Sequence, residues 1–303
     1  MSIITSGNAP KALRPGLAAI FNTEQNDKTK YHEMIYTKVS SDKQYEERLG
    51  LVGMGMAQAK PEGAPVVYGD MQQGYLRRTQ NVVIALGMQI TMEAMEDNLY
   101  DQMFDQARQL SRAVYLAKQT LGANIFNNGY SGSYTYLDGQ PLFSTAHVRK
   151  GGGTYSNRLA AGIDLSELAI ETIYTNVMAN RDERGNLDPL MTEKLVVPPA
   201  LFHQALRLTK SDRQAETANN AISAIVANGT IKSVVQNPFL TDSDAYFMTT
   251  DIPGTMGLIY QVRKELEFDQ DKDADTFNAK FLAHERYAFD VVDVRCVYGS
   301  PGN

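Results

Sequence analysis

The side chains that most often bind metals or act as nucleophiles are few in this sequence and lie far apart. The four histidines are His32, His147, His203 and His284, and no two of them have the four-residue spacing that places a pair of ligands on one helix face. The single cysteine, Cys296, has no partner for a disulfide or for a zinc-binding pair. We therefore expect no zinc site and no internal disulfide, and for His147 we expect a structural hydrogen bond.

Two short motifs resemble signatures of catalysis or nucleotide binding but lack the surroundings that those signatures need. In residues 150–154 the glycines follow the lysine, whereas in a phosphate-binding loop the lysine follows the glycines. Ser40 and Lys43 have the S-x-x-K spacing of penicillin-binding enzymes, but no K-T-G sequence accompanies them. The loops at 130–153 could line an enzyme site, yet no set of nucleophile, base and oxyanion donors can be read from their spacing. We expect no enzyme and no cofactor.

Four aspartates alternate between Asp269 and Asp275, as they do in a calcium-binding loop. The position that requires glycine holds Ala274, and the twelfth position, which requires glutamate, holds Lys280. These two departures favour a solvated turn between two strands. The sequence leaves cation binding at this turn open.

These residues must be positioned by the elements around them, and the clearest element is a long helix. Apolar residues recur every three or four positions from Met95 to Leu121, which keeps them on one helix face. Thr91 is a typical N-cap residue, and the run from Asn127 to Gly129 is a typical stop. The pattern predicts one helix over 91–128 with a length of roughly 50 Å.

The composition is that of an ordinary soluble protein with a net negative charge. The 303 residues are 43% hydrophobic and 21% charged, which is enough to bury a substantial core. No run approaches the roughly 20 apolar residues of a membrane span, and residues 1–15 lack the apolar region of an export signal. The net charge of −6 argues against tight binding to nucleic acid. We expect folding in a cytoplasm and no membrane partner.

The sequence of the first ninety residues predicts an extended arm followed by a long two-stranded hairpin. Residues 1–45 are polar and mixed in charge, apart from a short apolar cluster that includes Leu17 and Phe21. Two strand-like runs, 49–56 and 75–90, flank the turn-forming sequence at 60–63. An isolated hairpin is marginally stable in water. We therefore expect the arm and the hairpin to lie on a neighbouring subunit.

The rest of the chain predicts helices and strands that share one body, without a repeat or a flexible linker. In order, these are loops at 130–159, a helix from 166 to about 185, a strand at 195–197, helices at 200–208 and 221–227, strands at 231–235 and 246–248, and long strand runs at 258–268 and 281–297. This mixture indicates the α+β class.

Several sequence segments, taken in chain order, resemble those of a known family. They are ITMEAMEDNLYDQ at 90–102, LGANIFNNGYS at 121–131, FSTAHVRKGGGTYSNRL at 143–159, KLVVPPAL at 194–201, NAKFLAHERYAF at 278–289 and GSPG at 299–302. With these, the chain resembles the major capsid (head) proteins of tailed bacteriophages, in particular the group similar to the Mu-like phage head subunit. The specificity of the resemblance lies in the number and order of these stretches, which span nearly the whole chain.

The resemblance implies a phage major-capsid fold in four parts. These are an N-terminal arm (1–45), an extended β-hairpin loop (46–90), a peripheral domain (91–163 and 255–303) with the spine helix 91–128, and an axial α/β domain (164–254). It also implies hexamers and pentamers that close into an icosahedral virion head around double-stranded DNA. The alternative with the same fold is an encapsulin-like shell around a cargo enzyme.

The resemblance further implies partners and an assembly surface. We expect a portal protein, a separate scaffolding protein and assembly in the host bacterial cytoplasm, with a decoration protein left open and the genome enclosed without tight specific binding. Lys60 is the only lysine in the extended loop, and with no identifiable partner we expect no covalent cross-link. The residues expected at the assembly interface are Leu17, Phe21, Glu46, Glu47, Met54, Met56, Lys60, Pro61, Val66, Val67, Arg77 and Arg78.

Overall fold

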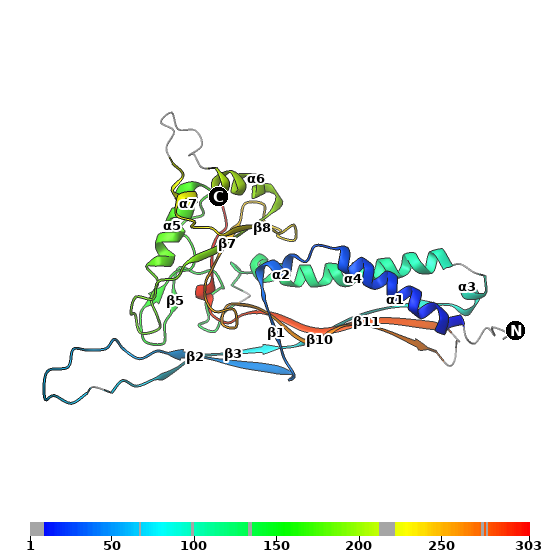
Figure 1. Ribbon diagram of the computed structural model, residues 1–303, viewed down its shortest axis with the longest axis horizontal. Helices are drawn as coiled ribbons and strands as arrows, with labels where there is room; N and C mark the ends of the chain where they lie inside the picture. Colours follow the sequence, from blue (N-terminus) through cyan, green and yellow to red (C-terminus); the bar gives the residue numbers. More distant parts are fainter. Residues whose placement is uncertain are drawn as a thin grey trace.

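Two layered parts and a projecting hairpin make up the molecule. The computed structural model describes residues 9–66, 68–97, 100–132, 135–211, 222–273, 276 and 278–303. Figure 1 shows an elongated body at the right, a second part that stands above its other end, and a hairpin that runs away to the left. We call the first two the peripheral part and the axial part.

The secondary structure alternates between helices and strands along the chain. The helices are α1 (Ala9–Asp27), α2 (Tyr31–Ile35), α3 (Met92–Glu96), α4 (Tyr100–Asn127), α5 (Glu167–Met178), α6 (Pro199–Lys210), α7 (Ala224–Ala227) and the 3₁₀ turn η2 (Val294–Cys296). The strands are β1 (Thr37–Ser40), β2 (Tyr45–Val52), β3 (Gln72–Gln80), β4 (Val82–Ile90), β5 (His147–Val148), β6 (Thr154–Tyr155), β7 (Thr192–Val197), β8 (Ser233–Gln236), β9 (Tyr246–Thr250), β10 (Leu258–Lys272), β11 (Ala279–Val291) and β12 (Val297–Ser300). None of the helices within the described ranges combines the length and apolar character that a membrane crossing requires.

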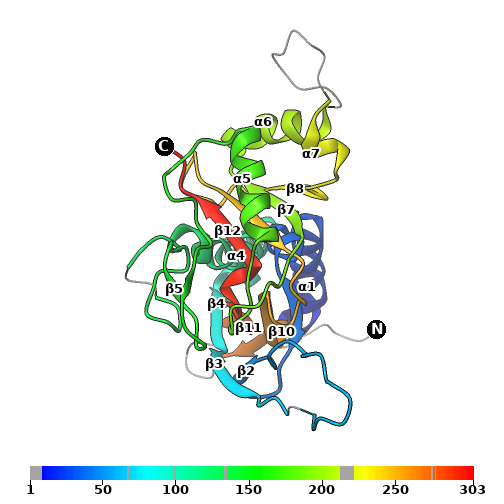
Figure 2. The same cartoon turned by 90° about the vertical axis from the view of Figure 1, so that its left-hand side faces the viewer.

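A four-stranded sheet in the order β1-β10-β11-β4 forms the peripheral part. Strand β1 pairs parallel with β10, and the other pairs are antiparallel. Seen end-on in Figure 2, α1 and α4 lie above β10 and β11, while the hairpin strands β2 and β3 lie below them. Because side chains alternate across a strand, Phe281 and Ala283 of β11 are buried under the helices and Leu282 between them is exposed.

The predicted long helix is two helices. The N-cap prediction is confirmed, since the Thr91 hydroxyl accepts a hydrogen bond from the Ala94 backbone amide at 3.3 Å. However, α3 ends at Glu96, where the Asp97 amide donates back to the Glu93 carbonyl, and α4 spans Tyr100–Asn127; residues 98 and 99 between them lie outside the described residues. Asp competes with the backbone for hydrogen bonds, which explains why α3 ends before Asp97. The predicted stop is confirmed, because α4 ends at Asn127.

The buried face of α4 follows the predicted pattern over its first half and then rotates. Met103, Ala107, Leu110 and Val114 are buried as the pattern predicts, whereas Leu121 is exposed. In the second half the buried positions are Gln119, Gly122, Ala123, Ile125 and Phe126. At Gly122 an added Cβ atom would lie 3.4 Å from the Phe289 ring, which is van der Waals contact. The first half of α4 packs with α1 and β11, whereas Ile125 and Phe126 belong to the cluster that contains Phe247 of the axial sheet.

The structure corrects the prediction of an extended arm for the described part of residues 9–40. Leu17 and Phe21, four residues apart on one face of α1, are both fully buried in the chain's own core. The Phe21 ring stacks on Phe268 of β10 with 4.9 Å between ring centroids. The hydroxyl of Ser111 on α4 donates to the Phe21 carbonyl at 3.0 Å. Helix α1 therefore covers the sheet beside α4.

The predicted second strand of the hairpin is divided between two sheets. Strand β3 pairs with β2 as the hairpin, whereas β4 pairs with β11 in the peripheral sheet, and Asn81 separates them. The predicted turn is present, since the Ala64 amide donates to the Pro61 carbonyl at 3.2 Å. The residues between Val52 and Gln72 form no strand in their described part.

The axial part is a second sheet, in the order β12-β9-β7-β8, with α5, α6 and α7 packed on it. Strand β12 lies within the range predicted for the peripheral domain but pairs antiparallel with β9. Helix α5 ends at Met178, several residues before the predicted end, and its Ser166 N-cap accepts from the Ala169 amide. The predicted turn at 269–275 is partly strand, because β10 extends to Lys272; Ala274 and Asp275 lie outside the described residues.

Replacing Phe21 by alanine tests whether α1 packs on its own chain in solution. We expect the free energy of unfolding of the isolated chain to fall by about 3 to 5 kcal/mol, the usual loss for a buried phenylalanine. The matched control is Leu168→Ala on α5, whose side chain is 70% exposed, and for it we expect a change within about 0.5 kcal/mol. Chemical denaturation measures both, and an unchanged stability of F21A would contradict the packing.

Candidate assembly interface

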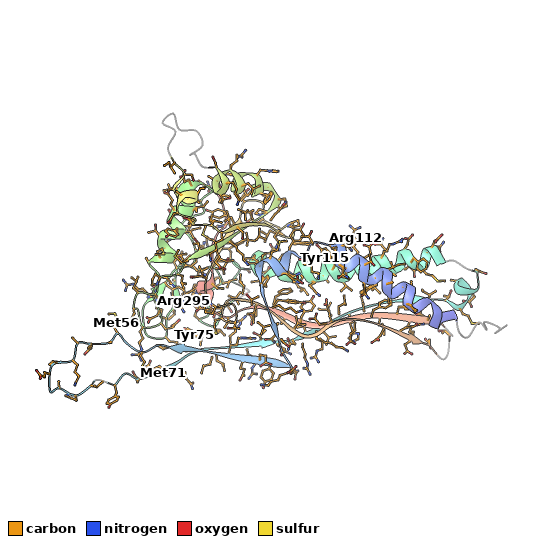
Figure 3. All side chains as sticks on the ribbon, in the orientation of Figure 1. Met56, Met71, Tyr75, Arg112, Tyr115 and Arg295 are labelled. Atoms are coloured by element: carbon orange, nitrogen blue, oxygen red, sulfur yellow. The ribbon has the colours of Figure 1, made fainter. Side chains whose placement is uncertain are left out.

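The end of the hairpin carries a set of large apolar side chains that the chain itself does not cover. We call residues 53–71 the hairpin tip. Its exposed apolar side chains are Met54, Met56, Val66, Tyr68 and Met71. Figure 3 shows Met56 and Met71 on the strand-free segment that runs away from both parts of the molecule. Tyr68 is 92% exposed and Met56 is 78% exposed, and large exposed apolar side chains on one segment make the tip a candidate interaction surface.

The predicted interface residues of the tip are exposed where the structure describes them. Met54, Met56, Lys60, Pro61 and Val66 are all on the surface. Val67 lies outside the described residues. Their presence on one projecting segment follows from β2 and β3, which end at Val52 and begin at Gln72.

The root of the hairpin is fixed to the body by a buried ion pair. The Nε atom of Arg77 on β3 donates to both carboxylate oxygens of Asp290 on β11 at 2.9 Å, and its Nη2 donates to the same carboxylate. The two side chains are only 17% and 6% exposed. Asp290 also accepts from the Thr79 hydroxyl at 2.5 Å and from the Val291 amide at 2.9 Å. We call this set the Arg77–Asp290 clamp.

The clamp corrects the prediction that Arg77 faces a neighbouring subunit. Its guanidinium is held inside the chain by Asp290 and lies 5.5 Å from the centroid of the Tyr136 ring. Burial raises the pKa of Tyr136 above its usual value, so the ring beside the guanidinium stays neutral. Leu17 and Phe21 are corrected in the same way, because both are buried in the chain's own core.

The neighbouring charges pair across the hairpin on its exposed face. Glu47 and Arg78 are partners in the strand register, and Arg78 Nε donates to Glu47 Oε1 at 2.8 Å. This hydrogen bond raises the pKa of Arg78. The Arg78 guanidinium also lies 4.4 Å from the centroid of the Tyr45 ring. Glu46 accepts from the Ser41 hydroxyl at 3.0 Å. Of these contacts, the Glu47–Arg78 pair joins register partners and so favours the observed register of β2 against β3.

The sequence did not predict a buried polar network that lies beside the clamp. Gln261 of β10 is fully buried, and its side-chain amide nitrogen Nε2 donates to Asn81 Oδ1 at 2.9 Å. Its Oε1 accepts from Arg48 Nη1 of β2, also at 2.9 Å. Asn81 Nδ2 donates to the Ser41 hydroxyl at 3.1 Å and to the Lys43 carbonyl at 2.9 Å. The one available signal was an asparagine that interrupts an otherwise strand-like run.

Loops beneath the axial part brace the hairpin from a second side. The Tyr75 hydroxyl donates to the Val148 carbonyl at 3.0 Å, and the Lys150 ammonium lies 4.3 Å from the centroid of the Tyr75 ring. Nearer the tip, Arg184 Nη2 donates to Asp70 Oδ1 at 3.0 Å, and this bond lowers the pKa of Asp70. Figure 3 shows Tyr75 where the hairpin passes under the body.

The loop that receives Tyr75 is itself ordered by a buried histidine, which confirms the structural hydrogen bond predicted for His147. His147 Nδ1 lies 2.6 Å from Asp138 Oδ2, and its Nε2 lies 3.1 Å from both the Leu142 carbonyl and Asn157 Oδ1. These contacts hold the imidazole ring from both of its nitrogens, and His147 is fully buried.

A comparison with protein families identifies the family, and comparisons with solved structures show the fold. A family model described as phage capsid protein matches residues 80–300. No curated protein sequence matches the chain. Among solved structures, one of Microbacterium phage Oxtober96 is similar with a TM-score of 0.54 and 12% identity, covering 91% of this chain and 92% of that one.

Two further structures are similar in fold. The virus-like particle from Pyrococcus furiosus has a TM-score of 0.51 and 10% identity, covering 94% of this chain and 98% of that one. The holo-SrpI encapsulin complex from Synechococcus elongatus has a TM-score of 0.55 and 8% identity, covering 92% of this chain and 89% of that one. At these identities the structures show the shared fold, and the family match supplies the assignment. Because that match spans residues 80–300, well over half of the sequence, the chain belongs to the phage capsid protein family.

Proposed function

We propose that copies of this chain assemble as hexamers and pentamers into a closed icosahedral head that encloses double-stranded DNA. The observation that carries the proposal is the exposed apolar tip on a hairpin that projects away from the rest of the chain. In a capsid protein, the natural cover for such a surface is a second copy of the chain. The tip residues Met54, Met56, Lys60, Pro61 and Val66 would then lie at the contact between copies.

Hydrophobic burial at the tip supplies the attraction between copies. Fully burying a side chain such as methionine or valine is worth about 1.5 to 3 kcal/mol, and the tip side chains begin partly covered, so each contributes less. A single contact of this size is weak. In a closed shell every copy both gives and receives a hairpin, and many linked contacts hold far more strongly than one.

The clamp contributes by orienting the hairpin before assembly. A hairpin that is free to swing would lose conformational entropy on binding, and a segment fixed in its bound direction avoids that loss. The Arg77–Asp290 clamp, the Gln261 network and the Tyr75 brace hold its root from three sides. The Glu47–Arg78 pair on the exposed face would act in partner choice more than in net affinity.

The remaining parts of the proposal concern partners and location. The head would assemble in the host bacterial cytoplasm with a portal protein and a separate scaffolding protein, and it would be found in the virion. The net charge of −6 suits a container that holds DNA without tight specific binding. The proposal includes no enzymatic activity, no cofactor, no covalent cross-link through Lys60 and no membrane.

A second candidate is an encapsulin-like shell that encloses a cargo enzyme. The observation in its favour is the fold shared with the SrpI encapsulin at a TM-score of 0.55. The two candidates share the assembly surface and differ in what the particle contains.

The contents of purified particles separate the two candidates. We expect closed shells by electron microscopy and, after nuclease treatment of particles from lysed host cells, protected double-stranded DNA without a cargo protein at a fixed ratio to the shell. A fixed-ratio enzyme cargo and no protected DNA would support the encapsulin-like shell instead. A chain that stays monomeric at high concentration would contradict both.

Polar substitution of the tip tests the role of its apolar side chains. For the triple variant Met54→Ser, Met56→Ser and Tyr68→Ser we expect an unchanged fold, because all three side chains are exposed. We expect assembly to need at least a roughly tenfold higher concentration, since losing about 1.4 kcal/mol corresponds to that factor. Sedimentation measures it. The control Met54→Leu, Met56→Leu and Tyr68→Phe keeps the surface apolar and should assemble normally; equal assembly by both variants would contradict the proposal.

Two adjacent arginines offer a matched test of the clamp. Arg77→Met leaves the Asp290 carboxylate buried without its partner, for which we expect a loss of about 3 to 5 kcal/mol in unfolding free energy. Arg78→Met removes a pair whose side chains are 60% and 37% exposed, and we expect a much smaller loss because solvent screens an exposed ion pair. Chemical denaturation compares the two, with shell yield as the second readout. Equal losses would show that the clamp does not hold the hairpin.

A further inference from the structure

The face of the peripheral sheet that points away from α1 and α4 brings together three side chains from two strands. Glu267 and Asp269 are two residues apart on β10 and therefore share a face. His284 of β11 is the register partner of Glu267. One ligand atom from each of the three side chains lies within 4.8 Å of the others, and all three side chains are exposed or half-buried.

A cation already lies between two of these groups. The Lys264 ammonium is 2.8 Å from Glu267 Oε2 and 2.8 Å from His284 Nε2. An ammonium can only donate hydrogen bonds, so His284 Nε2 must accept with its lone pair. The imidazole lone pair and the carboxylate are thus both aimed at one position that holds positive charge. A lone pair in this orientation is what a metal ion requires of histidine.

The mixture of ligands indicates the class of metal. Calcium and magnesium prefer sites made of oxygen ligands, whereas zinc and its neighbours accept imidazole nitrogen together with carboxylate oxygen. Ligand atoms around a tetrahedral zinc ion lie roughly 3.4 Å apart, given bond lengths of about 2.1 Å. The side chains of Glu267 and Asp269 are exposed, and a change of rotamer in each would bring their carboxylate oxygens to this separation.

We propose that Glu267, Asp269 and His284 form a binding site for one Zn²⁺ ion, which displaces the Lys264 ammonium and completes its coordination with water. The ion would join β10 to β11 across the irregular stretch of their pairing, where the register shifts between Lys264 and Glu267. It would therefore stabilise the longest strand pair of the peripheral sheet. This site is separate from the hairpin tip, and the proposal does not depend on what the shell contains.

The spacing of the histidines along the sequence predicted no such site. That prediction considered ligands four apart on a helix, whereas here the ligands meet through the antiparallel register that pairs Glu267 with His284. The alternating aspartates beginning at Asp269 were considered as a calcium loop, but Asp269 lies within β10 and contributes from a strand.

Titration of the purified full chain with Zn²⁺ in a calorimeter tests the site. We expect one saturable ion per chain, and a rise of several degrees in the midpoint of thermal unfolding when the ion is in large excess over its dissociation constant. For His284→Ala and Glu267→Gln we expect at least a tenfold loss of affinity. For Lys264→Met we expect tighter binding, because the competing ammonium is gone.

The matched control is His203→Ala, which removes an exposed histidine from α6 far from the three ligands. We expect it to bind Zn²⁺ like the unaltered chain. Circular dichroism without metal checks that each variant is folded. Three results would overturn the proposal: no saturable one-to-one binding, an affinity that His284→Ala leaves unchanged, or an equal loss in His203→Ala. The Co²⁺ absorption spectrum gives an independent readout, since a bound ion with a nitrogen ligand changes it and His284→Ala should abolish the change.

Discussion

The buried ion pair between Arg77 and Asp290 is the constraint on which the rest of the structure depends. Removing two charges from water is expensive, and the attraction between them offsets that loss only when the geometry is good and the other lone pairs are satisfied. Here the guanidinium donates to both carboxylate oxygens, while Thr79 and the Val291 amide satisfy the carboxylate further. These contacts favour the direction in which the hairpin leaves the body.

The peripheral part supplies the rigid support that this clamp needs. Asp290 lies near the end of β11, and β11 is held between β10 and β4 and covered by α4. Helix α1 completes the cover with Leu17 and Phe21. A single hydrophobic cluster, which includes Phe126, Phe143 and Phe247, joins the peripheral part to the axial part. The clamp thus rests on packed secondary structure, whereas the apolar side chains of the tip are exposed.

Local patterns in the sequence predicted local structure well. The Thr91 cap, the stop after Asn127, the turn at Pro61 and the α+β class all follow from residue types within a few positions of each other. The burial of Leu17 and Phe21 does not follow from local patterns. An apolar cluster indicates that its side chains will be buried, but it does not indicate whether the same chain or a neighbouring one buries them. The clamp was missed for a related reason: Arg77 and Asp290 are distant in sequence, and their contact depends on β3 lying across β11. The same holds for the meeting of Glu267 and His284, which only the strand register reveals.

The path of the chain from β11 to β12 has a mechanical consequence. Asp290, which anchors the hairpin, is followed by the short η2 turn and then by β12, which pairs with β9 in the axial sheet. The anchor and the axial sheet thus lie on one uninterrupted stretch of backbone, residues 290–300. A pull on the hairpin passes through the clamp to Asp290 and then along the backbone to the axial part. Strain at the hairpin contact is therefore shared by the axial part.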